Sequence, residues 1–243
     1  MKIYHQVSTR IHKSTLSPGD RLWVKDRLEI FRDYSYWSLT QQTFQEFAVV
    51  ITTTGIYRSV VEEMIANLPQ GPKVVCVEEG NVQQRIDLIP PCDFVYSTRL
   101  DSDDMYHRDA LDLVHQCSPL DKRGVSCSMF ARGFSYDIRD GRWGKYFNPS
   151  SPFHTFMIPR GFYCDVAKMG TLEHKHGRIK STYPTTTFPD WKFCVLRHGA
   201  NTTTDQFLAD LRRKGKLPPK EVFTGKNHAC FGRSVQDFVQ GKI

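Results

Sequence analysis

The chain has 243 residues, of which 40% are hydrophobic and 24% charged, a composition typical of a folded globular protein with an ordinary core. Its seven cysteines are odd in number and form no CxxC pair, which argues against a disulfide framework and against a cysteine zinc site. The formal net charge of +7 favours anionic partners such as nucleic acid, acidic membrane surfaces or phosphorylated small molecules.

The chain alternates strand-like and helix-like patterns as far as about residue 116. Short apolar or alternating runs predict four strands, over residues 2–7, 47–51, 73–77 and 94–98. Apolar residues at helical spacing predict helices over residues 21–42, 57–68 and 105–116. This order predicts an α/β fold with an open, mostly parallel central sheet flanked by helices. Ligands of such sheets bind beyond the carboxyl ends of the strands.

The pattern becomes irregular beyond about residue 120, with short strands and many Gly, Pro and aromatic residues. Because no linker composition separates the two halves, we expect residues 1–118 and residues 119–205 to share one core as a single domain. We expect residues 206–243 to form a basic C-terminal extension, packed on or beside that domain. This extension is either a solvated basic face, or a contact for an acidic membrane surface or for a phosphate of the acceptor.

An acidic cluster directly after the fourth predicted strand is the strongest chemical signal. Asp101, Asp103 and Asp104 fall within four residues, where like-charge repulsion is costly. A divalent cation would remove that cost, and Mg²⁺ or Mn²⁺ prefers carboxylate oxygen. Alternate residues of an extended turn point the same way, so Asp101 and Asp103 can face one ion while Asp104 caps the next helix. The alternative is three solvated loop acids.

Two arginines stand at the ends of predicted strands. Arg10 follows the first strand and Arg99 follows the fourth. Both can donate charge-assisted hydrogen bonds to phosphate groups. The alternative is that each forms a structural salt bridge.

Several segments together resemble one enzyme family. Residues 97–104, with the sequence STRLDSDD, resemble the DxD region of glycosyltransferases with the GT-A fold. They are especially similar to the rhamnosyltransferase family that is related to the large inverting family 2. Further similar segments lie at residues 8–10, 23–32, 41–44 with Phe47, 151–153 and 191–201. The resemblance therefore covers roughly residues 1–205.

The resemblance implies a GT-A-type nucleotide-sugar-binding fold, with residues 1–118 as the nucleotide-sugar-binding half and residues 119–205 as the acceptor-side half. The activity that it implies is a metal-dependent transfer of a sugar from a nucleoside-diphosphate sugar, with inversion. The family's name points to rhamnose, and the acceptor is a glycan, a lipid-linked sugar or a protein side chain.

The resemblance also implies the residues of the site. The donor is expected to contact Thr9, Arg10, Arg99 and Asp101. The Mn²⁺ or Mg²⁺ ion is expected to be held by Asp101, Asp103 and His198.

An inverting transfer needs a base that accepts the proton of the acceptor hydroxyl, and a carboxylate is the usual choice. Related families place this acid some way before the late histidine, so Glu173 is the first candidate. Asp190, beside Trp191, is the second candidate, and Asp137 is the third. The chain lacks the Glu-Asp pair that many related enzymes show, so all three stay open.

Two other functions remain as alternatives. A metal-dependent nucleotidyl or phosphoryl transferase would use similar aspartates, but the sequence has neither a GxxxxGK[ST] loop nor an equal second acidic cluster. A non-catalytic nucleic-acid-binding module would suit the net charge, but acids at the predicted ligand edge repel phosphates unless a metal ion is present. We therefore expect a nucleotide-sugar donor and no nucleic-acid partner.

The sequence also bears on location. No run of about eighteen apolar residues occurs, and the first residues lack the apolar stretch of a signal peptide. Cysteines without a disulfide pattern fit a reducing compartment. We expect a cytoplasmic protein, either soluble or held at a membrane surface through the basic segment 206–243.

Overall fold

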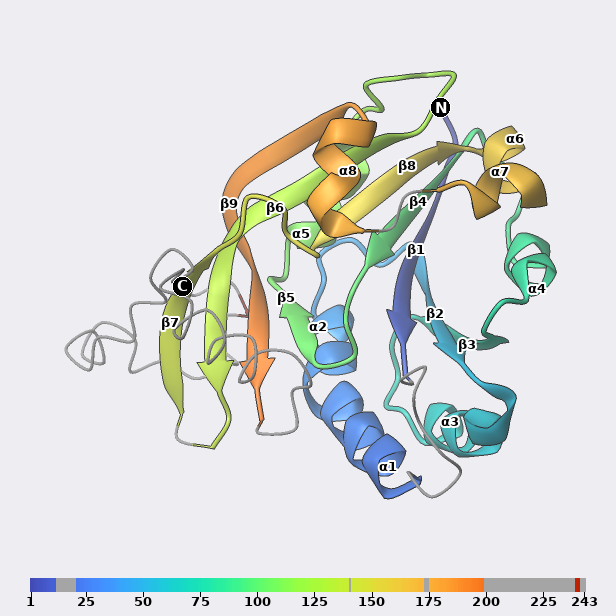
Figure 1. Cartoon of the computed structure of the whole chain (residues 1–243). Coiled ribbons are helices and arrows are strands. Elements are labelled where there is room, and N and C mark those ends of the chain that lie inside the picture. Colours follow the sequence, from blue (N-terminus) through green and yellow to red (C-terminus); the bar gives the residue numbers. More distant parts are fainter. Residues whose placement is uncertain (12–20, 140, 173–174, 199–238, 241–243) are drawn as a thin grey trace, which may run out of the picture.

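Strands occupy much of the described chain and join into one sheet. The computed structural model describes residues 1–11, 21–139, 141–172, 175–198 and 239–240 (Figure 1). Within these residues the sheet has nine strands in the order β3-β2-β1-β4-β8-β6-β9-β5, and β7 pairs with β6 outside that order. The strands are β1 Ile3–Arg10, β2 Phe47–Thr53, β3 Lys73–Glu78, β4 Phe94–Arg99, β5 Asp104–Tyr106, β6 Ser126–Asp137, β7 Arg142–Phe147, β8 His154–Pro159 and β9 Thr185–Arg197. The helical segments are α1 Arg21–Ile30, η1 Phe31–Tyr36, α2 Trp37–Thr40, η2 Gly55–Tyr57, α3 Arg58–Ala66, α4 Val82–Asp87, α5 Ala110–Gln116, α6 Arg160–Tyr163, α7 Val166–Gly170 and α8 His176–Thr182.

The four strands β3, β2, β1 and β4 are parallel to one another, and they confirm the four strands predicted from apolar runs. Every residue of β2 is buried, as expected for a continuous apolar strand covered on both faces. The register sets Arg10 of β1 opposite Thr52 of β2, and Ser8 of β1 opposite Arg99 of β4. The carboxyl ends of these strands therefore bring distant parts of the sequence to one edge.

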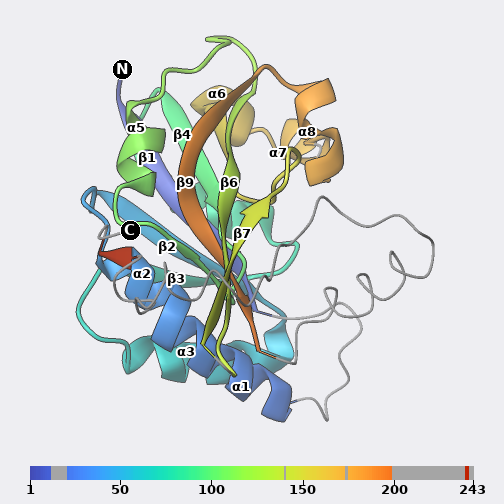
Figure 2. The ribbon, with the colours of Figure 1, turned by 90° about the vertical axis from the view of Figure 1, so that its left-hand side faces the viewer.

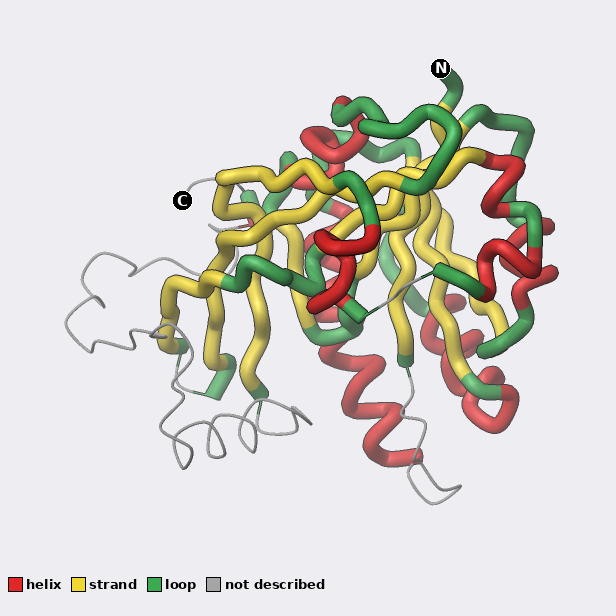
Figure 3. Tube along the Cα trace, turned by 45° about the horizontal axis from the view of Figure 1, so that its top comes forward, coloured by secondary structure: helices red, strands yellow, loops and turns green. Residues whose placement is uncertain are grey.

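The second half of the sheet is mixed. Strand β8 joins β4 in antiparallel fashion, β6 is antiparallel to β8, and β9 is parallel to β6. The β6–β9 register shifts between Phe130 and Arg132 and again between Arg132 and Phe134, which is typical of strands that bend. Strands β6, β7 and β9 curl away from β1–β4 (Figures 1 and 3). The predicted parallel pairing thus holds for the first four strands, and mixed pairing follows.

Helices cover both faces of the sheet (Figure 2). One core cluster packs Val24 of α1 and Leu111 of α5 against the parallel strands. A second cluster packs Tyr163 of α6 and Ile179 of α8 against β4, β6 and β8. The predicted single α/β domain with flanking helices is confirmed. In the part of the chain described, no helix is long and apolar enough to cross a membrane.

The expected helix over residues 105–116 is shorter than predicted, because α5 begins only at Ala110. Asp104 and the two residues after it form β5, which is antiparallel to β9 and sets Asp104 opposite Val195. Asp104 Oδ1 accepts a hydrogen bond from the backbone N–H of Leu196 at 3.2 Å. The predicted helix-capping role of Asp104 is therefore wrong. Local periodicity does not encode a pairing with a strand so far along the chain.

His5 of β1 lies in the core and has no exposed surface. Its Nε2 is 2.7 Å from Thr98 Oγ1, and its ring stacks on His115 with ring centroids 6.0 Å apart. Burial and, after it, the charge of His115 lower the pKa of His5 to about 3. The folded chain therefore keeps His5 neutral under mildly acid conditions.

This burial predicts a loss of stability in acid. An unfolded histidine has a pKa of about 6.5, so below that pH the unfolded chain gains a proton that the folded chain excludes. Lowering the pH from about 7 to about 5 is expected to cost about 2 kcal/mol of unfolding free energy through His5. Urea unfolding at several pH values measures this loss. In His5→Gln the unfolding free energy should depend less on pH, because unfolding then takes up one proton fewer. An equal pH dependence of the unfolding free energy in the native chain and in His5→Gln would contradict the buried, neutral state of His5.

Candidate functional site

A cavity of about 640 Å³ lies at the carboxyl ends of the parallel strands and continues over β8. Its volume is in the range of small-molecule sites, and its position is the one where open α/β sheets bind ligands. The lining residues come from the ends of β1, β2 and β4, from the turn after β3, and from β8, α4, α6 and α7. Four predicted site residues belong to this lining: Thr9, Arg10, Arg99 and Asp101.

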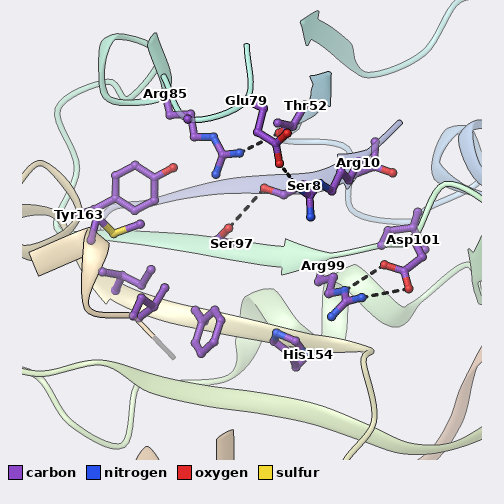
Figure 4. A pocket seen from close by; sticks show the side chains of 17 residues that line it. Ser8, Arg10, Thr52, Glu79, Arg85, Ser97, Arg99, Asp101, His154 and Tyr163 are labelled. Carbon is purple, nitrogen blue, oxygen red and sulfur yellow. Dashed lines mark hydrogen bonds and ion pairs between the residues drawn. The ribbon is translucent and has the colours of Figure 1, made fainter. Parts of the chain in front are cut away.

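Three arginines converge on the cavity. Arg10 ends β1 and pairs with Glu79, and Arg99 ends β4 and donates to both carboxylate oxygens of Asp101 at 2.9 and 3.1 Å. Arg85 reaches in from α4 and donates to Thr52 Oγ1 at 2.8 Å. Figure 4 shows the three side chains around the hydroxyl groups of Ser8, Ser97 and Thr52.

The charges around Arg10 and Arg99 differ. Burial and then the charges of Arg85 and Arg99 lower the pKa of Arg10. In Arg99, burial opposes the charged form, but the Asp101 carboxylate outweighs it and raises the pKa of that guanidinium. Crowded like charges are unfavourable, and an anion bound among them would relieve the repulsion. Arg10 and Arg99 thus form the salt bridges of the second alternative, and both lie in the lining of the cavity.

Hydroxyl groups and an apolar wall make up the rest of the cavity. Ser8 Oγ and Ser97 Oγ lie 3.4 Å apart on neighbouring strands. Beneath them the buried Gln6 donates to Ser97 Oγ at 3.2 Å and to Tyr163 Oη at 2.9 Å. The wall opposite this polar row is apolar and comprises Phe156, Ile158, Met169 and Leu172. The cavity thus offers arginine side chains, hydroxyl groups and an apolar wall.

The three clustered aspartates occupy three different environments. Asp101 lines the cavity beside Arg99. Asp103 forms an ion pair with Arg27 of α1, and its Oδ2 lies 3.0 Å from His198 Nε2. Asp104 is buried in β5, where burial and then the charges of Asp103 and Asp101 raise the pKa of its carboxyl group.

The pair of Asp103 and Arg27 is enclosed. The side chain of Arg27 is 7% exposed, that of Asp103 is 16% exposed and that of His198 is 3% exposed. The guanidinium carbon of Arg27 also lies 5.0 Å from the ring centroid of Trp23, a cation–π distance. Burial would raise the pKa of Asp103, but the hydrogen bond with His198 and the charge of Arg27 outweigh it and lower that pKa.

Arg27 was missed by the sequence analysis, although a signal existed. It follows Trp23 by one helical turn and precedes Phe31 by another, so it lies on the apolar face of the predicted helix. A charged residue on a buried helix face usually needs a partner. Asp103 is that partner here.

The expected metal ligands are only partly brought together. Asp103 and His198 are in contact, but Asp101 pairs with Arg99, and Arg27 already supplies a positive charge to Asp103. Among the described residues, no group of three or more His, Cys, Asp and Glu side chains could hold a metal ion. The arrangement therefore does not fit the predicted ion held by Asp101, Asp103 and His198.

No protein-family profile matches the chain, and no curated protein matches it. Among solved structures, the chain is similar to residues 1–349 of TarS from S. aureus, with 14% identity and a TM-score of 0.44 over 79% of this chain and 60% of that one. It is similar to an inositol-1-phosphate CTP transferase from T. maritima, with 12% identity and a TM-score of 0.42 over 88% of this chain and 98% of that one. A cytidylyltransferase from Leptospira borgpetersenii has 14% identity and a TM-score of 0.41, over 79% of this chain and 77% of that one. The chain spans 60% of the length of the TarS fragment and 37% of the longer TarS chain.

Two of the three predicted bases belong to the described residues. Asp190 is exposed on β9, and Asp137 ends β6, where it is buried and pairs with Arg139 at 2.6 Å. Neither belongs to the cavity lining. The remaining one, Glu173, lies outside the described residues.

Proposed function

We propose that the chain is a GT-A-type glycosyltransferase that binds a nucleoside-diphosphate sugar in the cavity. The observation that carries this proposal is the convergence of Arg10, Arg85 and Arg99 beside a row of hydroxyl groups. Guanidinium groups match the oxygens of a diphosphate, and they can bind it through paired hydrogen bonds. Ser8 and Ser97 offer hydrogen bonds to the hydroxyl groups of a ribose or a sugar.

The proposed reaction is a displacement at the anomeric carbon. The oxygen of the acceptor hydroxyl attacks that carbon, and the bond from the carbon to the diphosphate oxygen breaks. The electron pair leaves with the nucleoside diphosphate, whose added charge the arginines stabilise. The hydroxyl proton passes to a base, for which the proposal keeps Glu173, since Asp137 and Asp190 lie away from the cavity. Inversion, rhamnose as the sugar and a glycan, lipid-linked or protein acceptor are inherited from the resemblance.

A ligand panel tests the proposal. We expect nucleoside-diphosphate sugars, nucleoside-diphosphate rhamnose among them, to raise the thermal midpoint of the whole chain and to be hydrolysed slowly without an acceptor. Inorganic phosphate and a nucleoside monophosphate are the controls and should give smaller shifts. Release of pyrophosphate from a nucleoside triphosphate and a sugar phosphate would instead favour a nucleotidyl transferase. A response to nucleic acid alone would favour a binding module.

A further inference from the structure

The acidic cluster has its own positive partners in the fold. Three aspartates within four residues repel one another, and this cost is what a divalent cation would have removed. The structure instead gives Asp101 the guanidinium of Arg99 and gives Asp103 the guanidinium of Arg27. The repulsion between these two carboxylates is therefore relieved by protein cations.

Arg27 is fixed in place at Asp103. It is held by the Asp103 carboxylate and by the ring of Trp23 at 5.0 Å, and it lies close to His198, whose Nε2 is 3.5 Å from Arg27 Nη1 and donates to Asp103. Its side chain is 7% exposed, so it has little room to swing into solvent. A divalent ion on this carboxylate would lie beside a trapped positive charge in a poorly hydrated place, where repulsion is strong.

The cavity carries the charge that a diphosphate needs. Its lining has three arginines, Arg10, Arg85 and Arg99, against two acids, Glu79 and Asp101, which leaves one positive charge in excess. That excess falls to Arg85, which is held by the neutral hydroxyl of Thr52. An arginine can bind two phosphate oxygens at once, as a metal ion bridging a diphosphate does.

We infer that Arg27 occupies the place of a divalent cation at Asp103, and that the cavity arginines, rather than a metal ion, neutralise the departing diphosphate. The second half of this inference rests on the proposed function, whereas the first half does not. Asp103 and His198 then act as positioning residues that fix α1 and the end of β9 beside the site.

Titration with Mn²⁺ alone tests the first half. The free Mn²⁺ signal in electron paramagnetic resonance should not fall when the whole native chain is added at equal concentration. Arg27→Gln removes the trapped charge and should bind Mn²⁺ about ten-fold tighter or better than the native chain, while Arg27→Lys keeps the charge and should behave as native. Stoichiometric Mn²⁺ binding by the native chain would overturn the inference. This measurement on the native chain is decisive even if the Arg27 variants do not fold.

Calorimetry of a nucleoside diphosphate with the native chain tests the second half. The affinity in EDTA and in Mn²⁺ should agree within about two-fold, because the arginines are present in both buffers. Loss of binding in EDTA, restored by Mn²⁺, would overturn the inference. Absence of binding in both buffers would overturn the proposed function and, with it, the second half of the inference. The Mn²⁺ titration would still decide whether Arg27 occupies the place of a cation at Asp103.

Discussion

Replacing Arg85 by alanine is expected to lower the affinity of the chain for a nucleoside-diphosphate sugar by about ten- to hundred-fold. A hydrogen bond to a charged group contributes about 1.5–3 kcal/mol, and about 1.4 kcal/mol corresponds to ten-fold in affinity. Arg10 and Arg99 share their charge with Glu79 and Asp101, whereas Arg85 is bonded to the neutral Thr52. Arg85 therefore has the largest share of its charge to give to a ligand.

The same substitution should leave the fold intact, since α4 contributes no buried residue. Calorimetric titration with the sugar nucleotide measures the affinity, and thermal unfolding without ligand checks the stability. Arg58→Ala is the matched control, because Arg58 lies on α3 away from the cavity lining and pairs with Glu62 at 2.7 Å on the surface. Equal affinities of Arg85→Ala and Arg58→Ala for the sugar nucleotide would show that Arg85 does not bind it.

Much of the parallel half of the sheet is encoded locally. The buried strand β2 was predictable because a short apolar run ending in threonines is typical of a strand covered on both faces. The helix predicted over residues 21–42 is continuous as α1, η1 and α2 through Thr40. Strand β5 was not predictable, because its residues continue a helical pattern and their partner β9 comes much later in the chain.

Some residues of the candidate site were likewise predictable from the sequence, and others were not. Thr9, Arg10, Arg99 and Asp101 were predictable as cavity residues, because parallel strands that end at one edge bring their final residues together. Arg85 and Tyr163 reach the cavity from short helices whose packing no local pattern reveals. The separation of Asp101 from Asp103 also escaped prediction. Alternation along a turn says where two side chains can point, but the buried Arg27 decides where one of them goes.

Replacing Asp103 by asparagine is expected to lower the free energy of unfolding by about 3 kcal/mol. Asparagine has nearly the same shape as aspartate, so the loss reflects the charge and not the packing. Without that charge Arg27 stays buried and unneutralised, with only 7% of its side chain exposed. Urea unfolding measures the effect as a lower midpoint with an unchanged slope.

Asp101→Asn is the matched control, because it makes the same chemical change two positions earlier in the chain. The pair of Arg99 and Asp101 has side chains that are 38% and 40% exposed, so water already screens it. A solvent-exposed pair of this kind contributes less than about 1 kcal/mol, and Asp101→Asn should therefore unfold almost like the native chain. Equal losses in the two variants would contradict the buried pair of Arg27 and Asp103, because the two carboxylates would then be equally solvated.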